Sequence, residues 1–345
     1  MDVEQIVEIG RLIQKDPKQV AVRVAETFGI SRQAASAKLA ELKESGWISS
    51  SGTGRGIEYA LVDTIHHAQK YVMKGLSEDT VWRQACAPYI KGLPNNVRNI
   101  LHYGVTEMVN NAIDHSGSNT VEFYIERNLI STTCGVKDLG EGIFLKIQKA
   151  LNLFDAREAI LELAKGKLTT DPLNHTGEGI FFASKMFDFF WIESENLFFV
   201  HNENDPDTLV DKTNKAKPFH GTRVLMRIDN DSTRTSREIF DKFAEPDEFT
   251  FSKTIVPVHL AQHEGENLVS RSQAKRLTRR FERFQSVVLD FKGVAEIGQG
   301  FADELFRVFQ NSHPNITLAP INMTPSVKQM VLRVENARKR DKEGG

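Results

Sequence analysis

Three polar side chains lie at helical spacing in the middle of this 345-residue chain. The stretch TEMVNNAIDHSG, residues 106–117, places Glu107, Asn111 and Asp114 at positions i, i+4 and i+7, so a helix carries them on one face. Its apolar residues fall on the other side and can pack on a sheet. Carboxylate and amide oxygens are the ligands that Mg²⁺ prefers, and a carboxylate can also orient or deprotonate an attacking hydroxyl. This stretch therefore predicts a metal-assisted or acid–base site.

Three glycine-containing segments follow this helix along the chain. They are DLGEG at residues 138–142, TGEG at 176–179 and GT at 221–222. Asp138 can accept a hydrogen bond from the amino group of a base, and the glycines after it allow the backbone a close approach. TGEG precedes an apolar run, so its N–H groups could cap a helix N-terminus that holds phosphate.

In this order, ExxxNAxD, DxGxG, a second GxG and a late GT resemble the N box and glycine boxes of the GHKL ATPases. That superfamily contains gyrase, the large heat-shock chaperones, histidine kinases and mismatch-repair MutL. The resemblance covers most of residues 95–228. It implies an α/β sandwich of the GHKL (Bergerat) type that binds ATP and Mg²⁺, with residues 142–177 as a mobile lid.

The resemblance also implies a role for each motif residue. Glu107 is the expected catalytic residue, acting on a water or on a hydroxyl nucleophile. Asn111 is the expected Mg²⁺ ligand. Asp138 and Thr222 would hold the adenine end, and Asp114 would stand behind the metal ligand. The full nucleotide-binding set is Asn111, Asp114, Asp138, Gly140, Gly142, Thr176, Gly177, Gly179 and Thr222.

The first 64 residues have the pattern of two helices around Gly29, followed by the short strands WISSS and IEYAL around GTGRG. This pattern resembles a winged helix-turn-helix of bacterial transcription regulators, in which the second helix enters the major groove. Ser31 is a suitable N-cap for that helix. The predicted DNA contacts are Ser31, Arg32, Gln33, Ser36, Lys38 and Arg55.

Acidic and basic residues are about balanced in this segment. Because phosphate neutralisation dominates DNA affinity, two copies would have to bind together. A dimerisation or protein-docking module is the alternative interpretation of the same fold.

The C-terminal part resembles STAS-type domains, the fold of anti-sigma-factor antagonists, through VVLDFKGVAEIGQGFADELF. In the antagonists, a GHKL kinase phosphorylates a serine where the helix begins. Here that place reads Gly298-Gln299-Gly300-Phe301, which has no hydroxyl. Phosphorylation in cis at this position is therefore not expected.

The predicted fold class is a multidomain α+β protein. The predicted domains are a winged helix-turn-helix at 1–64, a GHKL-type ATP-binding domain at 65–244, a STAS-like domain at 245–337 and a charged tail at 338–345. The net charge of −2 gives no overall attraction to nucleic acid. The sequence has no apolar run of membrane length and no leader pattern, so we expect a cytoplasmic protein without membrane contact. Cys86 and Cys134 are expected to be buried thiols.

These features lead to one preferred function and two alternatives. The preferred function is an ATP- and Mg²⁺-binding regulator, a slow ATPase switch that controls dimerisation or docking and DNA binding. Such a switch would act as a homodimer, with a protein partner at the STAS-like domain. The alternatives are a serine/threonine kinase of the anti-sigma type acting on a STAS partner, and a nucleotide-binding scaffold without turnover. The basic residue that contacts the γ-phosphate is not identified, and the candidates are Arg157, Lys165, Lys167 and Arg271.

Overall fold

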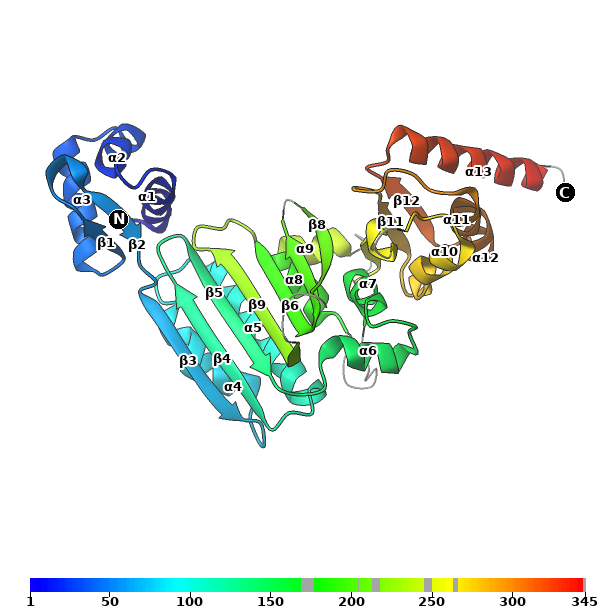
Figure 1. Cartoon of the computed structure of the whole chain (residues 1–345), viewed down its shortest axis with the longest axis horizontal. Coiled ribbons are helices and arrows are strands. Elements are labelled where there is room, and N and C mark those ends of the chain that lie inside the picture. Colours follow the sequence, from blue (N-terminus) through cyan, green and yellow to red (C-terminus); the bar gives the residue numbers. More distant parts are fainter. Residues whose placement is uncertain (169–176, 204, 213–217, 245–249, 263–265, 344–345) are drawn as a thin grey trace. The chain divides into compact units, whose positions relative to one another are not determined.

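The protein is mixed α/β and divides into two compact units (Figure 1). The computed structural model describes every residue except 169–176, 204, 213–217, 245–249, 263–265 and 344–345. The first unit comprises Met1–Glu141, Met186–Ile192 and His220–Ser236. The second unit comprises Gly142–Lys185, Glu193–Phe219 and Arg237–Gly345.

Helices and a hairpin form the N-terminal part of the first unit. They are α1 (Val3–Lys15), α2 (Val20–Phe28), α3 (Arg32–Glu44), β1 (Ile48–Ser51), the 3₁₀ turn η1 (Gly54–Gly56) and β2 (Glu58–Leu61). Gly29 ends α2 in the left-handed conformation, with φ 62°. Ser31 begins α3, where its Oγ accepts a hydrogen bond from the Ala34 N–H at 3.1 Å. Strands β1 and β2 pair antiparallel.

The N-terminal helices share a core with the β4–β5 turn of the same unit. Leu129 from that turn is buried in the cluster formed by the apolar faces of α1, α2 and α3. Gly10 on α1 allows this approach, because a Cβ there would lie 2.7 Å from Ile130 Cγ1. On the next residue of α1, the Arg11 guanidinium pairs with Asp231 at 2.8 Å and with Asp229 at 3.1 Å. The helices are therefore packed against the sheet of the first unit.

The rest of the first unit is a sheet covered by a long helix. Its hydrogen-bonded order is β3 (Ile65–Val72), β4 (Thr120–Arg127), β5 (Ser131–Asp138), β9 (Phe219–Asp229) and β6 (Phe189–Glu195). The helical segments are α4 (Glu78–Val81), the π-helical turn η2 (Trp82–Cys86), the 3₁₀ turn η3 (Ala87–Tyr89) and α5 (Asn95–His115).

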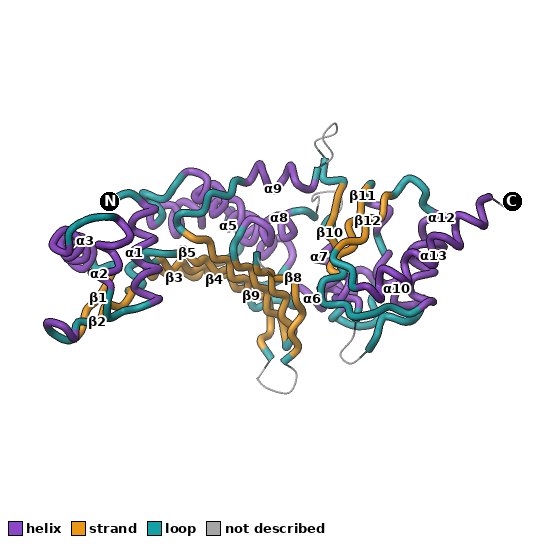
Figure 2. The backbone as a smooth tube through the Cα atoms, turned by 90° about the horizontal axis from the view of Figure 1, so that it is seen from above, coloured by secondary structure: helices purple, strands orange, loops and turns teal. Residues whose placement is uncertain are grey.

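Helix α5 lies along one face of β4, β5 and β9 (Figure 2). Gly104 on α5 permits close packing, since a Cβ there would lie 2.4 Å from the Phe187 ring. Cys86 and Cys134 are both buried free thiols in this unit, as the sequence predicts. A hydrogen bond to Cys86, with burial, raises the pKa of Cys134 well above its usual value.

The first half of the second unit contains helices, a hairpin and a linking helix. They are α6 (Ile143–Leu151), α7 (Glu158–Lys165), α8 (Gly179–Met186), β7 (Leu197–Asn202), β8 (Asp205–Asp211) and α9 (Ser236–Phe243). Phe181, Phe243 and Phe251 form an aromatic cluster in this unit, with the Phe181 and Phe251 rings stacked at 4.7 Å.

The second half of this unit is a parallel sheet with helices. The sheet order is β10 (Lys253–Pro257), β11 (Ser286–Asp290) and β12 (Thr317–Ile321). Its helical segments are the 3₁₀ turn η4 (Val258–Ala261), α10 (Arg271–Thr278), the 3₁₀ turn η5 (Phe281–Arg283), α11 (Gln299–Asp303), the π-helical turn η6 (Glu304–Phe309), α12 (Gln310–Ser312) and α13 (Pro325–Glu343).

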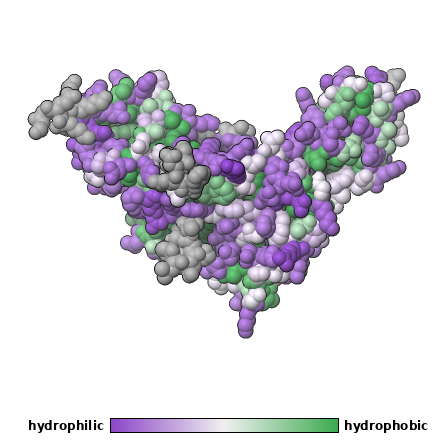
Figure 3. Space-filling model, turned by 180° about the vertical axis from the view of Figure 1, so that it is seen from behind, coloured by the Kyte–Doolittle hydropathy of each residue, from purple (hydrophilic) through white to green (hydrophobic). Residues whose placement is uncertain are grey.

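Hydrophilic residues predominate on the face shown in Figure 3, where apolar residues occupy separate small areas. Within the described residues, the structure contains no helix that combines the length and the apolar character needed to span a bilayer.

Candidate functional site

Glu107, Asn111 and Asp114 lie on one helix, α5, as the sequence predicts. Its helix is fixed by the opposite face, where Leu101, Val105 and Met108 are buried. Glu107 and Asn111 are partly buried, whereas Asp114 is exposed. The side-chain Nδ2 of Asn111 is buried and has no hydrogen-bond partner among the residues that the structure describes. A buried polar atom without a partner is unfavourable, so this amide is a candidate ligand-binding group.

The DLGEG loop is held against the C-terminal end of α5. The Glu141 N–H donates to the backbone oxygen of Ser116 at 3.0 Å. At Gly140, a Cβ would lie only 1.9 Å from that same oxygen, so no other residue fits without moving the loop. The glycine predicted for close approach to a ligand therefore has a demonstrable role in bringing the loop to α5. Ser116 is a residue that the sequence motifs do not mark.

Asp138 ends β5 at this loop and has a side chain that is only 5% exposed. Its Oδ1 accepts a hydrogen bond from the Gly140 N–H at 2.9 Å. Burial raises the pKa of this carboxyl, and backbone hydrogen bonds from Gly140 and Thr222 oppose that rise. The carboxylate is thus fixed in orientation by main-chain donors on two sides.

Thr222 lies opposite Asp138 in the β5–β9 ladder. Gly221, directly before it, has φ +110°, and a Cβ there would lie 2.3 Å from the Asp138 backbone oxygen. Only glycine suits both the conformation and the space. The first unit therefore brings the end of α5, the DLGEG loop and the start of β9 together.

The other predicted nucleotide-binding residues belong to the second unit. Gly142 is the first residue of that unit and the N-cap of α6, with φ 89°. Gly177 has φ +73°, and its oxygen accepts the Leu168 N–H at 2.9 Å. Gly179 begins α8. Thr176 lies outside the described residues.

The donor set around α5 is compatible with Mg²⁺. In the described part of the chain, no group of three or more His, Cys, Asp or Glu residues could hold a metal ion alone. Mg²⁺ usually keeps several waters and is bound through one or two carboxylates plus substrate phosphates. Asn111 offers a neutral amide oxygen, and the carboxylate of Glu107 lies one turn earlier on the same helix.

The four candidate γ-phosphate contacts all have partners within the second unit. Lys165 is buried and pairs with Glu162 at 2.8 Å, and Lys167 donates to the Arg283 oxygen at 3.0 Å. Arg157 pairs with Asp211 at 2.6 Å and Arg271 with Asp303 at 3.2 Å. These four side chains are engaged in this conformation, so the γ-phosphate contact stays unassigned.

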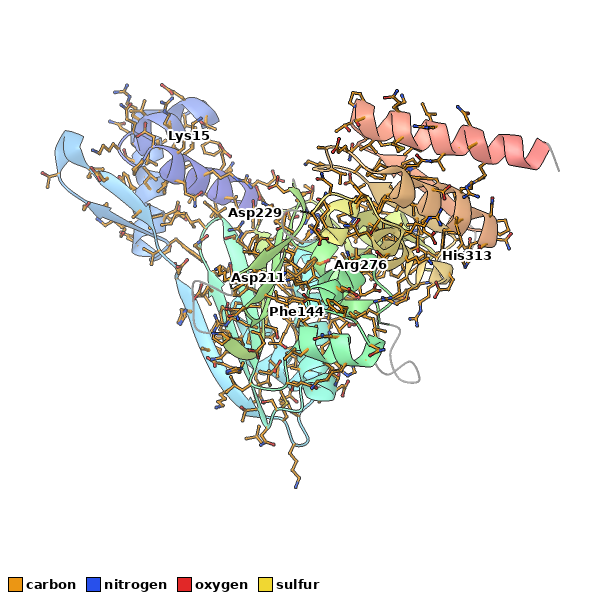
Figure 4. All side chains as sticks on the ribbon, turned by 45° about the vertical axis from the view of Figure 1, so that its right-hand side comes forward. Lys15, Phe144, Asp211, Asp229, Arg276 and His313 are labelled. Carbon is orange, nitrogen blue, oxygen red and sulfur yellow. The ribbon has the colours of Figure 1, made fainter. Side chains whose placement is uncertain are left out.

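A cavity of about 300 Å³ lies within the second unit. Asp211 and Arg276, two of its lining residues, are labelled in Figure 4. Its arginines are already paired with its own carboxylates: Arg157 with Asp211, and Arg276 with Glu158 at 3.7 Å. These two arginines are therefore already neutralised by carboxylates and do not offer a free positive charge to a ligand in the cavity.

The predicted DNA-contacting residues mark one side of α3. Ser31, Arg32, Gln33 and Ser36 are exposed and Lys38 is partly exposed, while Ala35 and Leu39 are buried in the core. Arg55 lies in η1, and its side chain is outside the described residues.

The comparisons with known proteins concern the C-terminal part. Residues 273–328 match a family described as a STAS-like domain of unknown function. This match confirms the predicted STAS-like domain within its matched range. No curated protein and no solved structure gives a match to the chain.

Proposed function

We propose that the chain is an ATP- and Mg²⁺-binding regulator whose nucleotide site is of the GHKL type. The observation that carries this proposal is the junction between α5 and the DLGEG loop. There the partly buried Glu107 and Asn111 lie on the helix whose end is hydrogen-bonded to the loop of the buried Asp138. The order of the four sequence motifs, from ExxxNAxD to the late GT, supports the same interpretation.

Each residue at the junction has a defined task in this proposal. The Asp138 carboxylate accepts a hydrogen bond from the adenine amino group, because its buried position and backbone donors hold it in one orientation. Thr222 supports the same end of the base. Asn111 supplies the metal-ligating oxygen, and Glu107, one turn earlier, orients or deprotonates the nucleophile. The bound nucleotide with Mg²⁺ supplies a phosphoryl group whose charge the metal neutralises.

The N-terminal part is the proposed DNA-binding module, a winged helix-turn-helix. Its support is the exposed polar side of α3 together with the packing of α1 on the β4–β5 turn. That packing buries Leu129 in the helical core, so the β4–β5 turn contacts the core that supports α3. Two copies binding together would supply the affinity that one balanced-charge module lacks.

The test is a calorimetric titration of the full chain with ATP and Mg²⁺. Wild type should bind. Asp138→Asn should bind about 10- to 100-fold more weakly, the effect of losing a hydrogen bond to a charged acceptor. Asp63→Asn, which changes an exposed carboxylate in the same unit, is the matched control and should bind like wild type. Equal affinity in all three, with Asp138→Asn still folded by circular dichroism, would refute the site.

Turnover distinguishes the regulator from the other predicted functions. Labelled γ-phosphate from ATP should appear as inorganic phosphate, and Glu107→Gln should abolish its release while keeping ATP binding. Label transferred to a protein hydroxyl would instead indicate a kinase. Binding without any label movement would indicate a scaffold.

A further inference from the structure

Helix α7 is buried along its whole length. Every residue from Glu158 to Lys165 is buried, including the charged Glu158, Glu162 and Lys165. A surface helix normally leaves its polar side in water. Buried charges need partners, so the groups that surround α7 decide whether it can move alone.

The partners of α7 come from α10 and the turn after it. The Lys165 Nζ donates to Glu162 Oε1 at 2.8 Å and to the backbone oxygens of Arg276 and Arg279 at 3.2 and 2.9 Å. These oxygens belong to the C-terminal end of α10, where the helix dipole favours a cation. The Arg280 guanidinium donates to the second oxygen of Glu162 at 2.9 Å.

The segment that follows α7 is held in the same way. Arg280 also donates to the Gly166 backbone oxygen at 2.9 Å. Lys167 and Arg283 each donate to the backbone oxygen of the other, at 3.0 and 2.8 Å. Thr254 on β10 donates to the Lys165 oxygen at 2.7 Å. Figure 2 shows α7 beside β10 within the second unit.

These contacts join two parts that the sequence assigns to different domains. Residues 276–283 lie inside the range that matches the STAS-like family, whereas α7 lies in the segment predicted to be the ATPase lid. Removing one partner of a buried ion pair leaves the other charge buried and unpaired, which is strongly unfavourable. Helix α7 therefore cannot separate from the STAS-like domain unless Glu162 and Lys165 become exposed to water or stay buried without their partners.

We propose that residues 142–168 and the STAS-like domain move as one body, so that nucleotide binding is transmitted as a displacement of the STAS-like domain. The Glu162–Lys165–Arg280 cluster is the clamp that joins them. The displacement of the STAS-like domain on nucleotide binding, here called the transmission step, rests on the proposed nucleotide site. The clamp itself does not.

The clamp is tested without nucleotide by hydrogen exchange of the full chain, read by mass spectrometry. In wild type, peptides from α7 should exchange as slowly as those from β11. Arg280→Ala should speed exchange in α7 and in 271–283 together, on the order of 100-fold, from the loss of a buried pair. Arg307→Ala, which removes an ion pair with Asp303 inside the STAS-like domain, is the control and should leave α7 unchanged.

Two results would overturn the clamp. One is rapid exchange of α7 in wild type beside a protected β11. The other is unchanged α7 exchange in Arg280→Ala. If Arg280→Ala does not fold, Arg280→Lys keeps the charge but cannot donate to Glu162 and to the Gly166 oxygen together, so it should still speed exchange across 158–168. Unchanged exchange in that variant would also overturn the clamp.

The transmission step is tested by spin-label distances in the full chain with a non-hydrolysable ATP analogue and Mg²⁺. Native Cys86 and Cys134 are buried, so labels report only from added cysteines. The pair Lys70→Cys and Ser312→Cys should change its distance, while Phe154→Cys and Ser312→Cys should not. An unchanged distance in the first pair although the analogue binds, or a changed distance in the second pair, would overturn the transmission. Absence of analogue binding in a parallel titration would instead refute the proposed function.

Discussion

Replacing the fully buried Lys165 by methionine should change how stability depends on pH. The Lys165 ammonium has no exposed surface and lies among Glu162, Arg279 and Arg280. Burial lowers the pKa of Lys165 from 10.5 to about 8, the attraction of Glu162 opposes that fall, and the two arginines add to it. Methionine keeps a similar volume and cannot titrate.

The sign and size follow from the two pKa values. Below pH 8 the lysine is protonated in both the folded and the unfolded state, so its contribution is constant. Between pH 8 and 10.5 the unfolded state binds more protons, so the free energy of unfolding rises with pH. At 1.36 kcal/mol per pKa unit the full rise is about 3 kcal/mol, of which about 2 kcal/mol falls between pH 7 and pH 9.5.

The assay is urea unfolding of wild type and Lys165→Met at these two pH values. All three tryptophans, Trp47, Trp82 and Trp191, lie in the first unit, so circular dichroism must be used to include the second unit. From pH 7 to pH 9.5, the free energy of unfolding of wild type should rise by about 2 kcal/mol more than that of Lys165→Met. Parallel profiles for the two proteins would refute the lowered pKa of Lys165 in the folded protein.

Three further substitutions test other parts of the account. Gly140→Ala should weaken ATP binding about tenfold or more, since its Cβ would clash with the Ser116 oxygen; unchanged affinity by calorimetry would contradict this. Arg32→Ala should reduce the slope of log affinity for DNA against log salt by about 1, measured by fluorescence anisotropy; an identical slope would exclude a phosphate contact. Arg11→Ala should lower the free energy of unfolding of the first unit by about 1 kcal/mol in tryptophan-detected urea unfolding, because Arg11 pairs with Asp231 at 2.8 Å; no loss would show that the pair is neutral.

Local features of the fold could be predicted from the sequence because each depends on a few neighbouring residues. Gly29 and Ser31 mark the end and start of adjacent helices through their own backbone and side-chain preferences. The STAS-like domain was predicted from one strand–turn–helix stretch. The spacing of Glu107 and Asn111 likewise places both on one helix face once that helix forms.

Features that depend on residues far apart in the chain could not be predicted in the same way. Glu162 and Arg280 are 118 residues apart, and nothing in the local pattern of α7 shows that both sides of this helix are covered. The insertion of Leu129 into the N-terminal core is equally non-local. Domain boundaries drawn from composition therefore cannot show which segments pack together.

The central claim is that ATP binds where α5 meets the DLGEG loop. Photo-crosslinking of the full chain with 8-azido-ATP and Mg²⁺, followed by peptide mapping, tests it most directly. The account predicts labelled peptides from residues 95–115 or 131–141, competed by excess ATP and lost in Asp138→Asn but retained in Asp63→Asn. Labelling confined to other peptides, or labelling that excess ATP does not reduce, would contradict the claim.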